Sequence, residues 1–232
     1  MGCCPSRYSG VRDGGSGLSS PPQIAFLGLD GSGKTTLMYK TLIPEWVGIA
    51  GSLPPTSAFH YERLQRGKLQ IGMWDLSGAL ALRGSWSAFY RYVDLWCVVY
   101  VINLLETQED RLTENKAILM QLANEACLKA ACIVVVLNTM GTPPESAPVP
   151  PSQLVSRLGL YEVASTEGQR IKWFVVDCRK GETDPQWAEA FRFILDRFHR
   201  IIYPPPPPPK RKEKKGGAQE GVPVVPEDAD AP

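Results

Sequence analysis

The sequence predicts an α/β fold, a mostly parallel six-stranded sheet with helices on both faces and one antiparallel hairpin at its edge. Short apolar runs alternate along the chain with segments whose apolar residues recur at helical spacing. A glycine-rich loop follows the first apolar run and opens the first helix. Two further runs flank a short polar turn, which is typical of a hairpin.

The expected strands are short apolar or alternating segments bounded by turn residues, and they cover residues 23–27, 59–64, 69–74, 95–102, 132–137 and 171–176. The first run stops at Gly28. The second and third lie on either side of residues 65–68, so we expect a hairpin there. The fourth and fifth are rich in valine and do not alternate, as expected of strands covered on both faces.

The expected helices cover residues 34–42, 109–130 and 187–202. The first follows the glycine-rich loop and ends before Pro44. The second carries Leu112, Leu119 and Leu122 at roughly helical spacing. The third places its aromatic and aliphatic residues on one face, which would close the domain against the sheet.

Length and composition place these elements in one domain. The 232 residues suffice for one well-packed domain with tails, over residues 22–203, between a flexible leader (1–21) and a disordered tail (204–232). A net charge of +1 with a nearly neutral middle argues against nucleic acid as a partner. The longest apolar run, residues 95–102, is far below the roughly 20 residues that span a bilayer.

Residues 28–35 fit the phosphate-binding pattern G-x-x-x-x-G-K-[ST], with a strand before the loop and a helix after it. Gly31 and Gly33 allow backbone N–H groups to turn inward, and with the helix N-terminus these donors suit phosphate oxygens. We expect Lys34 to bridge the β- and γ-phosphates and the Thr35 hydroxyl to ligate Mg²⁺. A glycine turn with a solvated lysine is the weaker alternative, and kinases and ATPases share the loop.

A second motif, Asp75-Leu76-Ser77-Gly78, ends the third expected strand. The Asp75 carboxylate can hold Mg²⁺ through water, and the N–H of Gly78 can approach a γ-phosphate because no side chain blocks it. Thr56 lies in a proline-rich loop before the hairpin, where its hydroxyl could complete the Mg²⁺ shell.

The chain resembles the Arf and Arf-like branch of the small GTPases over about residues 22–203. The residues that carry the resemblance are Gly28-Leu29-Asp30, Gly33-Lys34-Thr35-Thr36, Pro55-Thr56, Trp74-Asp75, Gly78 and Leu158-Gly159-Leu160. The resemblance implies a three-layer small-GTPase fold that binds GTP or GDP with Mg²⁺. The candidate nucleotide-binding residues are Gly28, Asp30, Gly31, Ser32, Gly33, Lys34, Thr35, Thr36, Thr56, Gly78, Asn138 and Cys178, and the candidate Mg²⁺ ligands are Thr35, Thr56 and Asp75.

The resemblance also implies an aromatic cluster that faces effector proteins. Phe59, Trp74 and Phe89 fall at the matching places. Three ordinary core aromatics are an equally good interpretation of the sequence alone. In that family the hairpin slides between the GDP and GTP states, which couples the nucleotide to membrane contact.

The sequence departs from the family at the position after Gly78, where a glutamine usually orients the attacking water. Ala79 stands there, and a methyl group cannot orient water. We expect slow hydrolysis at most, unless a partner supplies the group. Arg83 is near enough in sequence to be considered as a replacement.

The base-recognition motif, usually Asn-Lys-x-Asp, is Asn138-Thr139-Met140-Gly141. The missing aspartate would accept hydrogen bonds from the guanine N1–H and amino group, and its loss costs about 10- to 150-fold in affinity. Glu145 could substitute for it. The last base-contact loop is Asp177-Cys178-Arg179, where Arg179 replaces a small residue. The sequence therefore predicts intact phosphate recognition with weak or relaxed choice of base.

Both ends of the sequence carry features outside the predicted domain. Gly2 with Ser6 fits the N-myristoylation signal, and Cys3 and Cys4 are suitable palmitate acceptors; an unmodified flexible start is the alternative. The polyproline run 204–209 and the lysines after it are either a disordered tail or a ligand for an SH3- or WW-type domain.

These features favour a GTP-binding switch on the cytoplasmic face of a membrane, with effector and regulator proteins as partners, in vesicle traffic or membrane-protein delivery. The alternative is a non-hydrolysing pseudo-GTPase that acts as a membrane-tethered adaptor, favoured by Ala79 and Gly141. A P-loop kinase would need an arginine-bearing lid, and the sequence has no such insertion.

Overall fold

The computed structural model describes residues 20–46, 54–166 and 170–204. The predictions for the ends of the chain, lipidation at Gly2, Cys3 and Cys4 and a docking site on the proline-rich tail, lie outside the described residues. None of the helices in the described residues combines the length and the apolar composition of a transmembrane segment.

Six strands form one sheet in the order β2-β3-β1-β4-β5-β6. Their bounds are β1 Gln23–Leu27, β2 Phe59–Arg66, β3 Leu69–Leu76, β4 Leu95–Asn103, β5 Cys132–Asn138 and β6 Ile171–Val176. Every pair of neighbours is parallel except β2 and β3, which form an antiparallel hairpin at one edge. The predicted fold class is therefore confirmed.

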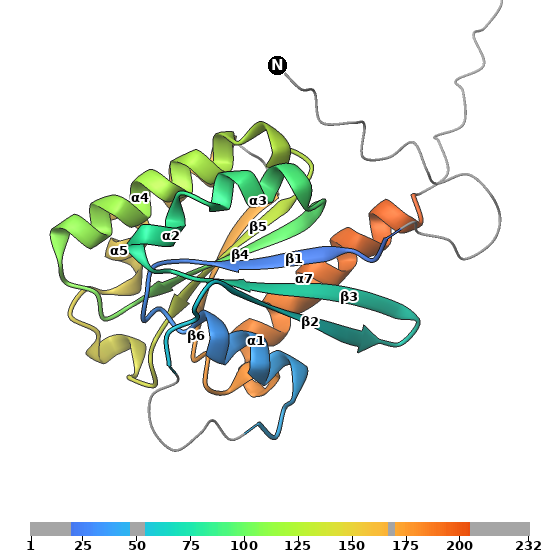
Figure 1. The fold of residues 1–232 in the computed structure, drawn as a ribbon. Coiled ribbons are helices and arrows are strands. Elements are labelled where there is room, and N and C mark those ends of the chain that lie inside the picture. The colour runs from blue at the N-terminus through green and yellow to red at the C-terminus, as the bar shows by residue number, and fades with distance from the viewer. Residues whose placement is uncertain (1–19, 47–53, 167–169, 205–232) are drawn as a thin grey trace, which may run out of the picture.

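Helices cover both faces of this sheet (Figure 1). Their bounds are α1 Lys34–Leu42, α2 Leu80–Arg83, α3 Trp86–Tyr92, α4 Glu109–Asn124, α5 Pro151–Arg157, α6 Leu160–Thr166 and α7 Pro185–Ile202. Helices α1 and α7 pack on one face, and the apolar side chains of α3 to α6 pack on the other. Alternate residues of β4 enter the two cores: Val99 lies with α1 and α7, whereas Val98 lies on the opposite side. This two-sided burial explains why the strand shows no alternation in the sequence.

Two expected boundaries were wrong. The helix expected over 109–130 ends at Asn124, because Glu125 is extended (φ −63°, ψ 120°) and caps a short 3₁₀ turn with its carboxylate. The break lets Leu128 turn into the core before β5. The hairpin turn is tighter than expected, since Gly67 takes a positive φ of 57° and the strands pair out to Arg66 and Leu69.

Helices α2, α3, α5 and α6 were not predicted from periodicity, because each is too short to show a repeating apolar face. Strand β1 is where the sheet order reverses, with β3 on one side and β4 on the other. Ligands of open α/β sheets bind at such a point, beyond the carboxyl ends of the strands. The loops after β1, β3, β5 and β6 meet there.

Candidate functional site

The loop after β1 keeps its backbone open toward a ligand. Gly33 has a φ of 96° and stands at the N-cap of α1, which has no side-chain cap and no acidic residue in its first turn. A Cβ at Gly33 would overlap the side-chain amide of Asn138, so only glycine fits. Ser32 is buried within the loop, whereas Thr36 is half-buried in the first turn of α1. The helix N-terminus is thus free to bind an anion.

Lys34 is buried at the start of α1, where its Nζ donates to the backbone oxygen of Leu29 at 2.8 Å. Burial lowers the pKa of Lys34 to about 8, against the opposing charges of Asp75 and Asp30. A buried ammonium held this way favours any anion that adds compensating charge. The ammonium thus lies against the backbone of the loop in which Lys34 was predicted to bind phosphate.

The three candidate Mg²⁺ ligands converge on one point. The hydroxyls of Thr35 and Thr56 donate to Oδ2 of Asp75 at 2.6 Å and 3.0 Å, and the two hydroxyl oxygens are 3.2 Å apart. Asp75 is fully buried, and its Oδ1 has no hydrogen-bond partner within the described residues. An orphaned buried carboxylate oxygen beside two hydroxyls fits a hard cation that prefers oxygen ligands.

His60 was missed by the sequence reasoning. Its Nδ1 lies 3.6 Å from Oδ2 of Asp75, and the imidazole is 43% exposed. The two residues are directly opposed in the β2–β3 ladder. The hairpin register, counted back from the turn, was the signal that could have found His60.

The loop after β3 packs directly on the phosphate loop. A Cβ added to Gly78 would lie 2.5 Å from the backbone oxygen of Gly28 and 2.6 Å from the nitrogen of Asp30, so no larger residue can approach as closely. Ala79 follows as the N-cap residue of α2, with only a methyl group.

Arg83 of α2 ties this loop to its surroundings and is buried except for 10% of its side chain. Its Nε donates to the backbone oxygen of Gly78 at 2.7 Å, and one terminal nitrogen pairs with Asp30 at 2.8 Å. The other terminal nitrogen pairs with Glu114 of α4. All of its donating nitrogens are therefore engaged.

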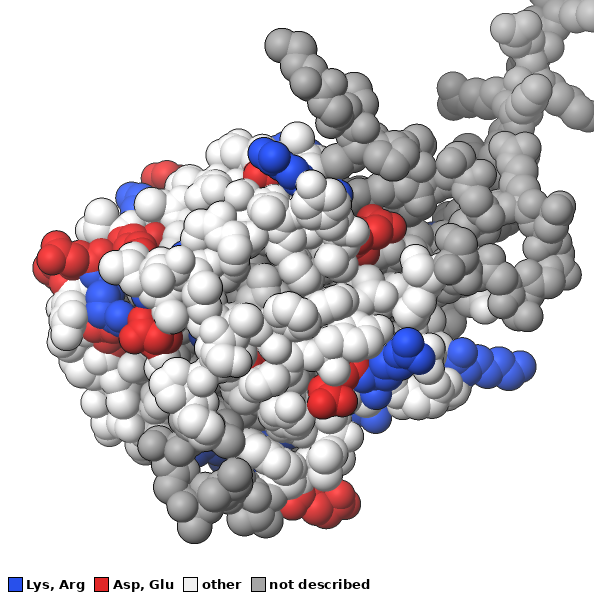
Figure 2. Space-filling view, in the orientation of Figure 1, with Lys and Arg blue, Asp and Glu red and all other residues white. Residues whose placement is uncertain are grey.

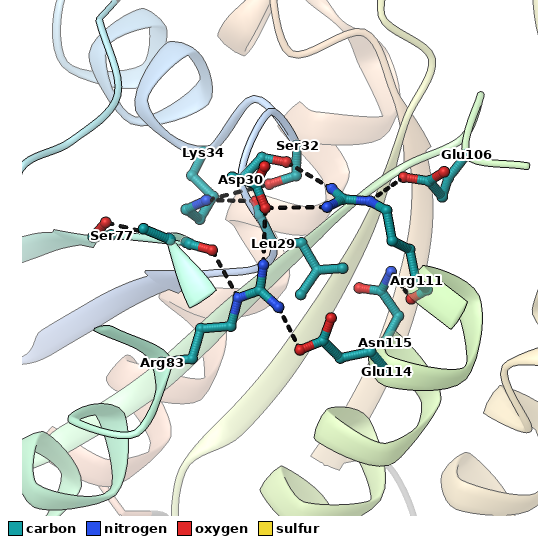
Figure 3. Close-up of polar contacts among 12 residues, drawn as sticks. Leu29, Asp30, Ser32, Lys34, Ser77, Arg83, Glu106, Arg111, Glu114 and Asn115 are labelled. Carbon is teal, nitrogen blue, oxygen red and sulfur yellow. Dashed lines mark hydrogen bonds and ion pairs between the residues drawn. The ribbon is translucent and has the colours of Figure 1, made fainter. Parts of the chain in front are cut away.

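Arg111 of α4 approaches Asp30 from the other side, as Figure 3 shows. Its terminal nitrogens donate to Oδ1 and to the backbone oxygen of Asp30, at 3.1 Å and 2.9 Å, and its Nε pairs with Glu106 at 2.5 Å. Partial burial raises the pKa of the Asp30 carboxyl, but Arg111 and Arg83 more than offset this and hold it below its ordinary value. The Asp30 carboxylate thus pairs with one arginine from α2 and one from α4, and its side chain points toward both of them.

Asn138, at the end of β5, links three loops and is 2% exposed. Its Nδ2 donates to the backbone oxygen of Ser32 at 2.8 Å, and its Oδ1 accepts from the backbone nitrogens of Cys178 and Met140 at 3.2 Å and 3.1 Å. Cys178 is completely buried, and burial raises the pKa of its thiol. Cys178 therefore contacts Asn138 through its backbone nitrogen.

The other residues of the predicted base-contact loops form no hydrogen bond with the Asn138 side chain within the described residues. Arg179 forms a two-pronged ion pair with Asp177, Nε to Oδ1 and a terminal nitrogen to Oδ2, both at 3.1 Å. Gly141 lies against the guanidinium of Arg179. Glu145 is exposed in a 3₁₀ turn over Pro144–Ser146.

The three predicted effector-facing aromatics do meet. The ring of Trp74 is 5.6 Å from that of Phe59 and 5.0 Å from that of Phe89, and Tyr61, which the sequence reasoning missed, adds a fourth ring at 4.4 Å. Phe59 is 55% exposed, whereas Trp74 and Phe89 are half-buried and pack against the core.

An apolar groove runs beside the cluster, and its lining residues carry no charge: Ala58, Phe59, Leu76, Ser77, Leu82, Ser85, Trp86, Ala88, Phe89 and Tyr92. Figure 2 shows a broad uncharged area across the middle of the face in view. Exposed apolar surface of this kind is typical of protein interaction sites.

Comparisons with known proteins agree with this geometry. The model of the ADP-ribosylation factor family matches residues 17–197. The chain is 32% identical over 136 residues to ADP-ribosylation factor-like protein 1 of Saccharomyces cerevisiae, which covers 59% of this chain and 70% of that protein. It is 27% identical over 157 residues to ADP-ribosylation factor D of Dictyostelium discoideum, covering 68% of this chain and 65% of that protein. The match to ADP-ribosylation factor-like protein 1 of Drosophila melanogaster is 33% identical and covers 50% of this chain and 60% of that protein.

Among solved structures, the Arl6 BBS3 small GTPase from Trypanosoma brucei with the bound nucleotide analogue GppNp superimposes with a TM-score of 0.61. The alignment covers 78% of this chain and 99% of that one at 21% identity. At this identity the likeness speaks for the fold alone.

Proposed function

The chain belongs to the ADP-ribosylation factor family, and from that premise we propose that it is a GTP-binding molecular switch that works with Mg²⁺. The observation that carries the proposal is the convergence of Thr35 and Thr56 on the buried carboxylate of Asp75. A scaffold without nucleotide would gain nothing from an orphaned buried carboxylate oxygen, which costs about 1–3 kcal/mol.

The residues divide into a phosphate part and a metal part. The free N-terminus of α1 and Lys34 would bind the phosphates, and the N–H of Gly78 would meet the terminal phosphate. Thr35, Thr56 and Asp75 would hold Mg²⁺, directly or through water. The ion, when bound, neutralises phosphate charge. Gly28, Asp30, Gly31, Ser32 and Gly33 shape the loop around it.

Nucleotide titration of Asp75→Ala against the parent chain tests this assignment. We expect the parent to bind GTP and GDP much more tightly with Mg²⁺ than with excess chelator, and the variant to lose most of that difference. Asp110→Ala, at an exposed position in the first turn of α4, is the matched control and should behave as the parent. Binding by the parent that is indifferent to Mg²⁺ would refute the metal assignment.

We further propose that the switch acts on the cytoplasmic face of a membrane, in vesicle traffic or membrane-protein delivery. The signal at Gly2 and the acceptors Cys3 and Cys4 support two lipid chains, which stable anchoring requires. The exposed groove beside Phe59, Trp74 and Phe89 suits an effector protein whose own apolar side chains fill it. The tail would recruit an SH3- or WW-type domain.

Membrane anchoring is tested by Gly2→Ala. We expect the variant, expressed in cells, to move from the membrane fraction to the supernatant after cell lysis, because palmitoylation of the neighbouring cysteines follows membrane contact. Ser9→Ala, in the same leader, is the control. Membrane association of Gly2→Ala equal to that of the parent would defeat the acylation proposal.

The second candidate, a non-hydrolysing adaptor, is favoured by one observation. Ala79 offers no polar group, and Arg83, considered as its replacement, is held by Gly78, Asp30 and Glu114. Single-turnover hydrolysis separates the two candidates, since binding of GTP without turnover supports the adaptor and measurable turnover supports a slow GTPase.

A further inference from the structure

Gly141, in the loop after β5, and Arg179, in the loop after β6, lie so close that only one of the two positions can carry a large side chain. Gly141 has a φ of 83°, and a Cβ built on it would overlap the guanidinium of Arg179. Any side chain at position 141 would need the space that Arg179 fills. The family motif carries a carboxylate at this position, so a cation stands here where an anion is usual.

Arg179 is fixed rather than free. Two of its nitrogens pair with the two carboxylate oxygens of Asp177, and its backbone nitrogen also donates to Oδ1 at 3.1 Å. Burial raises the pKa of the Asp177 carboxyl, but the hydrogen bonds and charge of Arg179 hold it below its ordinary value, so the pair stays ionised. The two-pronged geometry sets the plane of the guanidinium, and its remaining nitrogen lies against Gly141. The arginine side chain is 61% exposed, while that of Asp177 is 8% exposed.

Hydrogen bonds join the loops after β5 and β6 to each other and to Ser32 of the phosphate loop. Thr139 donates from its backbone to Val176 at 2.9 Å, and Asn138 joins Cys178 to Ser32. Arg179 therefore stands one residue from a buried link to the phosphate loop. By the family resemblance, the loop that carries Arg179 and the loop that carries Gly141 are the ones that would receive a base.

We propose that Arg179 determines which base the site accepts, by disfavouring the 2-amino group of guanine and favouring a purine with a carbonyl at that position, as in xanthine. This inference rests on the proposed nucleotide binding. Guanine presents N1–H and amino donors at this edge, and a guanidinium is also only a donor, so both would be left without acceptors. A 2-carbonyl group accepts from the guanidinium instead.

Competition titrations on the nucleotide-free full chain test the inference, with GTP, XTP, ITP and ATP displacing a fluorescent nucleoside triphosphate. We expect XTP to bind about ten-fold more tightly than GTP, with ITP between them, the modest factor reflecting the exposure of Arg179. The double variant Gly141→Asp, Arg179→Ala should reverse the order, because it returns an acceptor to the site; aspartate tolerates positive φ better than most residues.

Arg179→Ala alone, at an exposed side chain, should bring XTP and GTP to within about two-fold of each other. Arg192→Ala, an exposed arginine on α7, should leave the order unchanged. A parent chain that prefers GTP to XTP by ten-fold overturns the inference and leaves nucleotide binding standing. A chain that binds no triphosphate at all overturns both.

Discussion

At the scale of single residues, the site gains its properties from burial as much as from residue type. Lys34 was predicted from the loop pattern, but the sequence could not show that burial lowers its pKa to about 8. Thr35, Thr56 and Asp75 were each predicted as Mg²⁺ ligands, and their convergence agrees with that prediction. His60 was missed, although the hairpin register pairs it with Asp75.

The pKa of Lys34 predicts how triphosphate affinity depends on pH. Phosphates bind the protonated amine, and the free site loses that proton as pH rises through about 8. Affinity should be level below this pH and fall above it, by at most about ten-fold per pH unit because one proton is involved. Nucleotide titrations across this range measure the effect, with Lys34→Met as a control that binds weakly and shows no such fall. A level affinity up to about pH 10 would contradict the burial of a titrating amine.

Ala79 predicts a gain of function. Ala79→Gln restores the side chain that orients water and should raise the single-turnover hydrolysis rate by about 10- to 100-fold, or about 1.4–2.8 kcal/mol in the barrier. Ala79→Leu, which adds bulk without a polar group, is the control. Equal rates for the glutamine and leucine variants would show that water orientation is not what limits turnover.

At the scale of elements, sequence patterns located the strands and the longer helices. They did not locate where α4 ends or which distant residues make contact. Strands β4 and β5 were identified because two-sided burial demands unbroken apolar runs. The end of α4 at Asn124 was missed, because no glycine or proline marks it and the chain turns at the extended Glu125 instead. The contact between Arg111 and Asp30 was equally out of reach, because the residues are 81 positions apart and joined by a long side chain.

The Arg83 cluster predicts energetic coupling between α2 and the phosphate loop. A double-mutant cycle of Asp30→Ala and Arg83→Ala, followed by urea unfolding, should give a coupling of about 0.5–1 kcal/mol, kept small by the exposure of Asp30. Arg83→Ala alone should destabilise the chain by about 1–2 kcal/mol, because Glu114 and the Gly78 carbonyl lose their donor.

The matched control for this cycle is Arg91→Ala, an exposed arginine in the last turn of α3, which should change the free energy of unfolding by less than about 0.5 kcal/mol. Strict additivity of Asp30→Ala and Arg83→Ala would mean that the ion pair contributes nothing to holding α2 on the loop.

At the scale of the whole molecule, the fold brings the nucleotide loops and the apolar groove into contact with the same segments. The groove is lined by the start of β2 and by α2 and α3, and these segments also carry the contacts of Asp75 and Gly78. A change at the terminal phosphate can therefore reach the groove through two short connections. This is the physical basis for a switch, since nucleotide state and partner binding would be coupled through shared elements.

Amide hydrogen exchange of the full chain, loaded in turn with GDP and with a non-hydrolysable GTP analogue in Mg²⁺, tests the central claim most directly. The switch predicts slower exchange with the triphosphate in residues 54–66 and 77–92, and unchanged exchange in β5 and α7. Equal exchange in the two bound states throughout these segments would contradict it.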